Sequence, residues 1–322
     1  MMRSRILSVL SACLVAATVA AGCGADVAPG SMVPVRPAER PLPGGVKLDP
    51  EVPKENKDND CGDPTASLAP SGTSVPSGST MDEIRKRGRL IAGVDQNTYL
   101  FGFRNPTTGE LEGFDIDIVR EIAERLLGDR SKVQFKALPA SQRIDALKDG
   151  SVDLVAYTMT VTCERRKDVE FSSVYFESGQ RILVAKGSDY KKVSDLGNKP
   201  VCAPAESTSL TNLAKEDPPP DLIAVDDLAD CLLLLQQRQV EAVSTDDSIL
   251  AGMAKQDPSV HVVGEQFSKE PYAIGIPKGN TDMVRYVNAV LDDIRNDEWD
   301  QLYGKWLEPV LGPAQPPAPK YR

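Results

Sequence analysis

Two adjacent arginines, Arg165 and Arg166, closely follow an apolar stretch, "VDLVAYT", that is typical of a β-strand. Thr158 and Thr160 stand at the end of this stretch, so in an extended chain their hydroxyls face the same side. A guanidinium group, threonine hydroxyls and free backbone N–H groups together suit a carboxylate. On composition alone, an equally good interpretation is a surface arginine that pairs with a nearby acid such as Glu164 or Asp168.

The rest of the chain offers little for catalysis. Its single histidine, His261, lies in the strand-like run "SVHVVG", and the sequence has no CxxC pair, Walker loop or dinucleotide fingerprint. One histidine is too few for a zinc site, and a serine or cysteine nucleophile would have to use that same residue as its base. These absences disfavour a hydrolase, and we predict no catalytic residue, no metal and no cofactor.

The overall charge argues against nucleic acid as a partner. The 322 residues carry a net charge of −10, whereas a nucleic-acid-binding surface needs a basic face. Apolar residues make up 41% of the chain, which is enough for a core, and the length fits one large domain or two smaller ones.

The N-terminus has the pattern of a lipoprotein signal peptide. Arg3 and Arg5 precede an apolar run that ends in "VAAGC" and is too short for a comfortable membrane span. We predict that residues 1–22 are removed and that Cys23 carries a lipid, which places the protein on the extracytoplasmic face of the cell membrane. The alternative is an ordinary signal peptide followed by a cysteine without a role.

Four further cysteines remain in the mature chain, an even number in an oxidising compartment. Four thiols allow three pairings. We favour a Cys202–Cys231 disulfide because both residues lie in one predicted lobe, and Cys61–Cys163 is then left by subtraction. Free buried thiols are the alternative.

Composition and periodicity divide the chain into parts. Residues 23–80 are rich in Pro, Gly, Ser and Asp and lack an apolar period, which predicts a disordered tether. Strands then alternate with helices, the pattern of an α/β fold, and a second such set is inserted between "QRILVAKG" and "PYAIGIPKG". We predict two lobes joined by a two-strand hinge, with lobe 1 over 81–183 and 275–310, lobe 2 over 184–274, and a flexible tail over 311–322.

Five sequence blocks occur in an order that resembles a known family. They are "GELEGFDIDIVREIAERL", "SQRIDALKDGSVDLVAYTMTVTCERRKDVEFSSVYFESG", "VCAPAESTSL", "VEAVSTDDSIL" and "YAIGIPKGN". The series is similar to that of the extracellular solute-binding proteins of the polar amino-acid family, family 3, over about residues 81–307. The resemblance implies a type II Venus-flytrap fold, in which an amino acid is clamped between two lobes.

The resemblance also implies roles for individual residues. Arg165 matches the arginine that holds the α-carboxylate of the ligand. Asp246 matches the aspartate that takes the α-ammonium, with Asp247 as the other candidate. Glu206 stands where the family usually has glycine. The other matched ligand-binding positions are Asp95, Tyr99, Thr158, Thr160, Ser207 and Thr208.

Arg143 indicates the class of amino acid. It lies in "PASQRIDAL", near the start of a short predicted helix, where an arbitrary arginine would be solvated. Glutamate- and aspartate-binding members of the family carry an arginine in the corresponding segment, where it grips the side-chain carboxylate. A buried guanidinium left unpaired by a neutral ligand is costly. The resemblance therefore implies L-aspartate or L-glutamate as the ligand, with asparagine and glutamine binding more weakly.

The partner stays open at this point. An ABC importer that receives the amino acid and a membrane sensor that reads the closed lobes are both compatible with the sequence, and we expect the protein to act as a monomer. The enzymatic alternative is a dehydratase derived from the same fold, which an assay for product formation would detect.

Overall fold

The computed structural model describes residues 41–53 and 61–322, and Leu42–Arg322 form one compact unit. The predicted signal peptide and the predicted lipidation site Cys23 lie outside the described residues. No helix in the described ranges is long and apolar enough to cross a membrane.

The first lobe is built on a five-stranded sheet. Its strands are β2 (Leu90–Val94), β6 (Val133–Ala137), β7 (Leu154–Val155), β8 (Val169–Phe171) and β16 (Gly275–Pro277). They lie in the order β6-β2-β7-β16-β8, with β2 parallel to β6 and β7. The late strand β16 pairs antiparallel with β7 and β8, so the chain returns to this lobe after building the second one.

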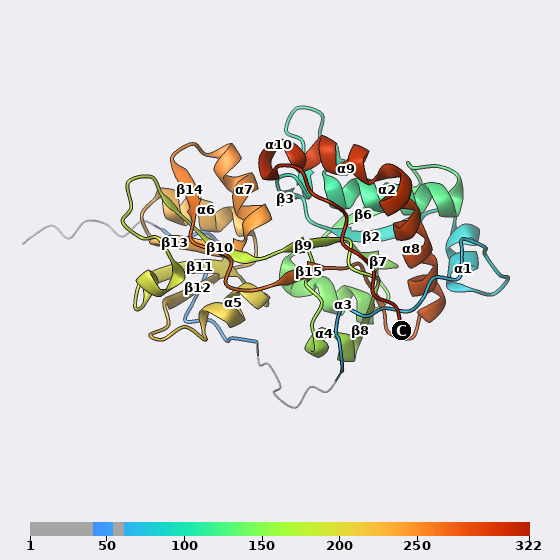
Figure 1. Ribbon diagram of the computed structural model, residues 1–322, viewed down its shortest axis with the longest axis horizontal. Helices are drawn as coiled ribbons and strands as arrows, with labels where there is room; N and C mark the ends of the chain where they lie inside the picture. The colour runs from blue at the N-terminus through green and yellow to red at the C-terminus, as the bar shows by residue number, and fades with distance from the viewer. Residues whose placement is uncertain (1–40, 54–60) are drawn as a thin grey trace, which may run out of the picture. The chain divides into compact units, whose positions relative to one another are not determined.

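Helices cover this sheet and complete its core (Figure 1). They are α1 (Thr80–Arg87), α2 (Phe114–Leu127), α3 (Arg143–Lys148), α4 (Cys163–Asp168), α8 (Thr281–Asp293), α9 (Trp299–Trp306) and α10 (Glu308–Leu311). α2 buries Ile118, Ile122 and Leu126 at helical spacing, and Gly128 ends it in the left-handed conformation, with φ 69°. A small sheet of β3 (Asn97–Thr98), β4 (Gly102–Arg104) and β5 (Leu111–Glu112) precedes α2.

The second lobe contains a six-stranded sheet in the order β1-β12-β11-β13-β10-β14. Its strands are β1 (Lys47–Leu48), β10 (Gln180–Ala185), β11 (Pro200–Pro204), β12 (Asp221–Val225), β13 (Ala242–Asp246) and β14 (Val260–Val263). Its helices are α5 (Thr208–Leu213), α6 (Leu228–Gln236) and α7 (Asp247–Gln256). Val201 and Ala203 belong to one buried cluster and Cys202 to another, because alternate residues of a strand face opposite sides of the sheet.

Two strands join the lobes, as the sequence predicts. β9 (Phe176–Ser178) and β15 (Glu270–Tyr272) pair antiparallel and lie between the two main sheets (Figure 1). β9 leads directly into β10, which belongs to the second sheet from Gln180 onward, a few residues before the predicted boundary at 184. The two-lobed α/β architecture with a two-strand hinge is therefore confirmed.

The predicted disordered tether over 23–80 is wrong for the residues that the structure describes within it. We call residues 42–53 and 61–69 the N-terminal arm. β1 of the arm pairs antiparallel with β12 at the edge of the second sheet. Farther along, the Ser67 hydroxyl donates to the carbonyl oxygen of Phe171 at 2.8 Å and accepts from Asn288 Nδ2 at 2.9 Å. The arm has no core of its own, but it is held by hydrogen bonds to both lobes.

The predicted flexible tail over 311–322 also has defined contacts. The backbone N–H of Arg322 donates to the carbonyl oxygen of Ser67 at 2.9 Å. The N–H of Ser67 in turn donates to the carbonyl oxygen of Lys320, also at 2.9 Å. The Tyr321 hydroxyl donates to Asp292 Oδ1 at 2.6 Å. The end of the chain thus lies beside the N-terminal arm, and this pairing of two apparently structureless segments fixes both.

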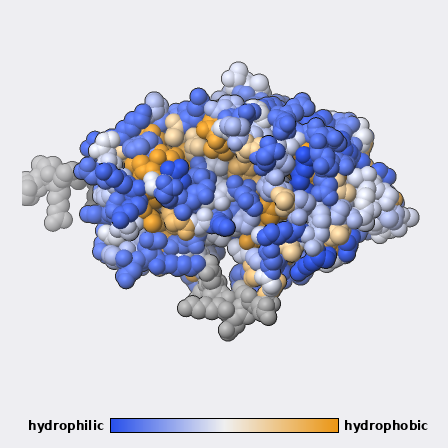
Figure 2. All heavy atoms as spheres, in the orientation of Figure 1, coloured by the Kyte–Doolittle hydropathy of each residue, from blue (hydrophilic) through white to orange (hydrophobic). Residues whose placement is uncertain are grey.

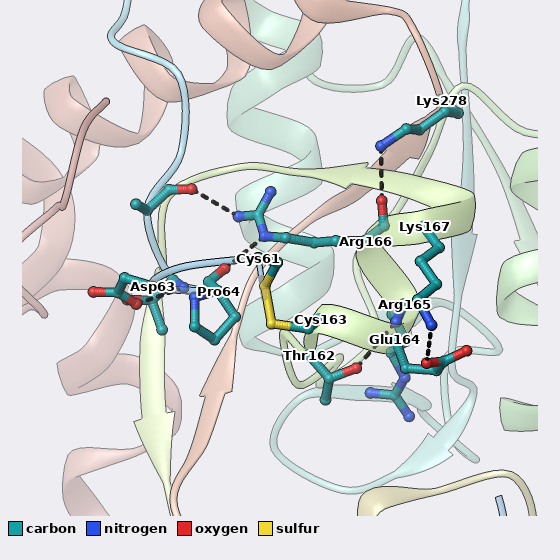
Figure 3. Close-up of a disulfide and its surroundings, with 12 residues drawn as sticks. Cys61, Asp63, Pro64, Thr162, Cys163, Glu164, Arg165, Arg166, Lys167 and Lys278 are labelled. Atoms are coloured by element: carbon teal, nitrogen blue, oxygen red, sulfur yellow. Dashed lines mark hydrogen bonds and ion pairs between the residues drawn. A yellow bond between two sulfur atoms is a disulfide. The ribbon is translucent and has the colours of Figure 1, made fainter. Parts of the chain in front are cut away.

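Both predicted disulfides are present. Cys202–Cys231 lies within lobe 2, between β11 and α6. Cys61–Cys163 ties the N-terminal arm to the first residue of α4 in lobe 1 (Figure 3). The second bridge therefore fastens the arm next to Arg165.

Few large apolar side chains are exposed among the described residues. They are Leu42 and Leu48, both on the N-terminal arm, and Leu233 on α6. Figure 2 shows a largely hydrophilic face with apolar atoms gathered over the region of α6.

Candidate ligand-binding site

One cavity between the lobes brings together all the predicted ligand-binding residues except Tyr99. Its free volume is about 40 Å³, and an outer cavity of about 850 Å³ shares Arg143, Arg165, Ser207 and Thr208 with it. The smaller volume is too little for an amino acid, so the lobes must move apart to admit one. The predicted residues that line the inner cavity are Asp95, Arg143, Thr158, Thr160 and Arg165 from lobe 1, and Ser207, Thr208 and Asp246 from lobe 2.

The lobes touch each other around this cavity. Asn97 Nδ2 of lobe 1 donates to Asp227 Oδ2 of lobe 2 at 2.6 Å. Arg165 Nη2 donates to the carbonyl oxygen of Glu206 at 3.3 Å, again from one lobe to the other. These contacts describe a closed arrangement that opening of the hinge would break.

Arg165 and Arg166 point in different directions and have different partners (Figure 3). Arg165 Nη1 donates to the carbonyl oxygen of Thr160 at 2.7 Å, and the side chain lines the cavity. Glu164, the acid considered as its surface partner, is instead paired with Lys167 at 2.6 Å. Burial, together with the nearby cation of Arg143, lowers the pKa of Arg165 to about 9, so the guanidinium stays charged at neutral pH and can meet an anion.

Arg143 is buried at the wall of the cavity. Its Nε donates to the carbonyl oxygen of Ala140 at 2.9 Å, and Nη1 donates to that of Tyr157 at 3.1 Å. Its guanidinium lies 5.1 Å from the centre of the Tyr157 ring, within cation–π range. Burial lowers the pKa of Arg143, and the carboxylates of Asp95 and Asp246 offset this only in part. The cleft therefore holds two guanidinium groups whose hydrogen bonds to the described residues go to backbone carbonyl oxygens only.

Asp246, at the end of β13, supplies an acceptor that nothing in the described part of the chain uses. Its Oδ2 takes a short hydrogen bond from the Tyr272 hydroxyl, whereas the buried Oδ1 has no hydrogen-bond partner there. Burial, with the nearby carboxylate of Glu270, raises the pKa of Asp246 well above its ordinary value. A cationic group placed at Oδ1 would satisfy this oxygen and restore the ionised form.

Thr158 has a backbone conformation that β-branched residues rarely adopt, with φ 39°. What holds Thr158 in this conformation could not be inferred from the sequence. Asp115, the second residue of α2, accepts from the N–H of Thr158 at 2.9 Å and from the Tyr175 hydroxyl at 2.7 Å. Such strain is common at binding sites, and here it sets how the strand end enters the cavity.

Thr160 and Thr208 approach each other from opposite lobes through a residue that the sequence analysis missed. Both hydroxyls donate to Glu270 Oε2, each at 2.7 Å. Glu270 is the first residue of the hinge strand β15 and only 2% of it is exposed. Its position before an apolar strand gave no signal, because its donors come from distant segments.

Ser207 and Glu206 shape the start of α5. Ser207 is the N-cap, and its hydroxyl oxygen accepts from the N–H of Leu210 at 3.1 Å, so this side chain serves its own helix. Glu206 has φ 53°, in the left-handed region that glycine favours. This geometry accounts for the glycine that is usual at this position in the family that the sequence resembles.

Asp95 and Tyr99 have less direct roles. Asp95 lines the cavity, but its Oδ1 accepts from the N–H groups of Gln96 and Asn97, at 2.7 and 3.1 Å, and its Oδ2 takes the Thr98 hydroxyl. Tyr99 lines a separate small cavity against α6, with its ring 4.9 Å from that of Phe103. Its predicted contact with the ligand finds no support in this geometry, and the aromatic ring that lines the inner cavity is Tyr157.

A comparison with known families agrees with this architecture. Residues 90–309 match the family described as bacterial extracellular solute-binding proteins, family 3, which is more than half of the chain. The chain belongs to this family. That membership confirms the expected class, a solute-binding protein rather than an enzyme.

Individual family 3 proteins resemble the chain along most of their length. The ABC transporter glutamine-binding protein GlnH of Bacillus subtilis is 40% identical over 71% of this chain and 85% of its own length. A glutamine-binding protein of Geobacillus stearothermophilus is 44% identical over 62% of this chain and 76% of its own. Among solved structures, an ancestral arginine-binding protein bound to glutamine superimposes with a TM-score of 0.65 at 38% identity, covering 69% of this chain and 98% of that one.

The buried Asp115 of this family 3 protein should make the stability of the free form depend on pH. Burial raises the pKa of Asp115 to about 6, from 3.8. Because the folded form holds the proton more tightly, the stability is fully present below about pH 4 and is lost as the pH rises through about 6. We expect this loss to be about 3 kcal/mol for Asp115.

Urea unfolding at pH 4 and pH 7.5 measures this effect. The difference in unfolding free energy between the wild type and Asp115→Asn should change by about 3 kcal/mol over that range, because the amide does not titrate. Asp189→Asn, at an exposed position, should leave the pH dependence of the wild type unchanged. A constant difference between the wild type and Asp115→Asn would contradict the prediction.

Proposed function

We propose that this protein captures an acidic amino acid, L-aspartate or L-glutamate, between its lobes and delivers it to an ABC importer. Asparagine and glutamine are proposed as weaker ligands. The importer is supported by the name of the Bacillus subtilis relative. The observation that carries the choice of ligand is the pair of guanidinium groups, Arg143 and Arg165, that face one cavity without a carboxylate partner among the described residues.

Each charge of such a ligand has a complementary group in the cleft. Arg165 suits the α-carboxylate, and Asp246 Oδ1 suits the α-ammonium. The first N–H groups of α5 have no partner within the helix and add donors on the side of lobe 2. Arg143 is then left for the carboxylate of the ligand's side chain. Because closure removes water, a ligand that lacked one of these charges would leave a buried protein charge unpaired.

The state of Asp95 favours a carboxylate over an amide. An amide side chain needs an acceptor for its NH₂ group as well as a donor for its oxygen. Asp95 is the acidic residue that lobe 1 contributes to the inner cavity. Three of the roughly four acceptor sites of its carboxylate are already taken, by Gln96, Asn97 and Thr98. The relatives named as glutamine-binding proteins make glutamine the main competitor, and binding measurements separate the two.

Membrane attachment through a lipid on Cys23 is part of the proposal. It is supported by the basic start, the short apolar run and the "VAAGC" sequence of the N-terminus. Lipid attachment would keep the binding protein near the permease, so that the captured amino acid is released where it is transported. Metabolic labelling with a radioactive fatty acid, with Cys23→Ala as the control, would test the attachment.

Calorimetric titration with the four candidates L-aspartate, L-glutamate, L-asparagine and L-glutamine tests the choice of ligand. We expect both acids to bind more tightly than both amides. Micromolar binding of glutamine without binding of either acid would refute the acidic assignment and leave a glutamine-binding protein. Failure of all four to bind would refute the proposed ligand class.

Replacing Arg143 with methionine tests the selectivity directly. We expect the affinity for L-aspartate and L-glutamate to fall about 100-fold, because the second carboxylate loses its cation. The affinity for L-glutamine should fall much less, so the ratio of the affinities for glutamate and glutamine is the decisive measurement. Arg181→Met, which removes a guanidinium bound to the carbonyl oxygen of Gly264 in lobe 2, is the matched control and should leave this ratio unchanged.

A further inference from the structure

Glu270 collects four hydrogen-bond donors in the interior of the hinge. Oε2 accepts from the hydroxyls of Thr160 and Thr208, each at 2.7 Å. Oε1 accepts from the Ser268 hydroxyl at 2.6 Å and from Asn212 Nδ2 at 3.1 Å. Four donors match an ionised carboxylate, which accepts through both oxygens, and do not match an amide or a protonated acid.

The donors come from both lobes. Thr160 belongs to lobe 1, whereas Thr208 and Asn212 belong to α5 of lobe 2. Thr160 and Thr208 line the inner cavity, but Glu270 does not. The carboxylate therefore lies behind the wall of the cavity and acts on the ligand site only through the residues it holds.

The polarity of the two hydroxyls follows from this arrangement. A hydroxyl has a single proton, and in both threonines it is given to Glu270. What remains for the cavity is a lone pair on each oxygen, so both hydroxyls face the ligand as acceptors. Such an oxygen repels a carboxylate and suits an ammonium group, which has donors only.

We propose that Glu270 is a positioning residue that presents Thr160 and Thr208 as acceptors for the α-ammonium of the ligand. They then act beside Asp246 Oδ1, whose carboxylate faces the same cavity. The inference rests on the proposed function only in requiring an amino acid as the ligand. It changes the role that the sequence analysis gave Thr160, from a partner of a carboxylate to a partner of the amine.

The same contact couples recognition of the amine to closure. Both hydroxyls reach one oxygen atom, Oε2, only while the lobes are together. When the hinge opens, at most one of them keeps that bond, and the other hydroxyl is free to rotate its proton toward the cavity. The acceptor site for the ammonium is thus assembled by closure, which favours the closed state for ligands that carry an amine.

The variant Glu270→Gln and the ligand pair L-aspartate and succinate test the proposal. Succinate is aspartate without its amine. The amide nitrogen of glutamine cannot accept a hydroxyl proton, so we expect the affinity for L-aspartate to fall about 10- to 100-fold and that for succinate to change by less than about twofold. L-glutamate and glutarate form a second pair of the same design.

Two further variants control this experiment. Glu177→Gln removes an exposed carboxylate from β9, the partner strand of β15, and should change neither affinity. Thr160→Val removes one of the proposed acceptors and should itself weaken L-aspartate binding. Adding Glu270→Gln to Thr160→Val should then cost less than it costs in the wild type, which is the signature of residues that act as a unit.

The outcomes separate the two proposals. If the wild type binds none of the four polar amino acids, the proposed function fails first. If the wild type binds and Glu270→Gln weakens L-aspartate and succinate equally, Glu270 is merely structural and the inference is overturned. An unchanged affinity of Glu270→Gln for L-aspartate overturns it as well. If Glu270→Gln does not fold, the measurement that decides is the ratio of the affinities of Thr160→Val for L-aspartate and succinate. A ratio equal to that of the wild type overturns the inference.

Discussion

Replacing Arg165 with methionine is expected to weaken the binding of an acidic amino acid about 1,000-fold and to leave the free protein at least as stable as the wild type. Among the described residues, this guanidinium donates only to the carbonyl oxygens of Thr160 and Glu206, and burial lowers its pKa to about 9. A buried cation without a counter-charge destabilises the free protein, and the carboxylate of the ligand supplies that counter-charge. Calorimetry measures the loss of affinity, and urea unfolding measures the stability.

The neighbouring arginine provides a control with the opposite expectation. Arg166 Nε donates to the carbonyl oxygen of Pro64 at 2.6 Å, and Nη2 donates to that of Ala66 at 3.0 Å, so it holds the N-terminal arm and not the ligand. Arg166→Met should lower the unfolding free energy by about 3 kcal/mol and change the affinity by less than about threefold. Retained binding in Arg165→Met, or equal effects of the two variants, would contradict this division of roles.

Much of the candidate site could be predicted because the positions depend on local rules. The period of a strand places Thr158 and Thr160 at the end of "VDLVAYT", and the parallel strands of a sheet end at the same edge. The resemblance to family 3 added Asp246 and Arg143, which local patterns alone would not single out. The structure brings these residues to one cavity from both lobes.

The residues that the sequence analysis missed depend on contacts between distant segments. In the sequence, Glu270 is simply an acid at the start of a strand. Its hydrogen-bond donors come from Ser268, from α5 and from the strand end at Thr160. Asp115 has the position of an ordinary acid in the first turn of α2, where the helix dipole already favours it. Its contact with the N–H of Thr158 exists only once α2 packs against that strand end.

The N-terminal arm shows a different limit of prediction. Its low content of apolar residues correctly excludes a core, but absence of a core does not mean absence of contacts. Side chains of the lobes donate hydrogen bonds to carbonyl oxygens of the arm. Arg285 Nη1 donates to the carbonyl oxygen of Ala69 at 2.6 Å, and Asn288 Nδ2 donates to the carbonyl oxygen of Leu68 at 2.7 Å. Since the donors lie more than 200 residues away, composition within the arm could not reveal them.

The disulfide Cys61–Cys163 is expected to contribute about 4.7 kcal/mol to the unfolding free energy, because it closes a loop of 102 residues. Removing it in the double variant Cys61→Ser/Cys163→Ser should therefore lower stability by about this amount, as measured by urea unfolding. The hydrogen bonds from Arg166 to Pro64 and Ala66 oppose local detachment of the arm, so the loss should appear in the cooperative transition of the whole domain.

Cys202–Cys231 is the matched comparison within the same chain. It closes a loop with a sequence separation of 29, so Cys202→Ser/Cys231→Ser should cost about 3 to 4 kcal/mol by the same loop-entropy argument. Cys202 and Cys231 are fully buried in lobe 2, so serine there also leaves polar groups in an apolar cluster and adds to the loss.

If removing Cys61–Cys163 left the unfolding transition unchanged while hydrogen exchange of Ala66–Leu68 became fast, the arm would be an independent unit. The bridge would then stabilise only the attachment of the arm beside Arg165, and the fold of the two lobes would not depend on it.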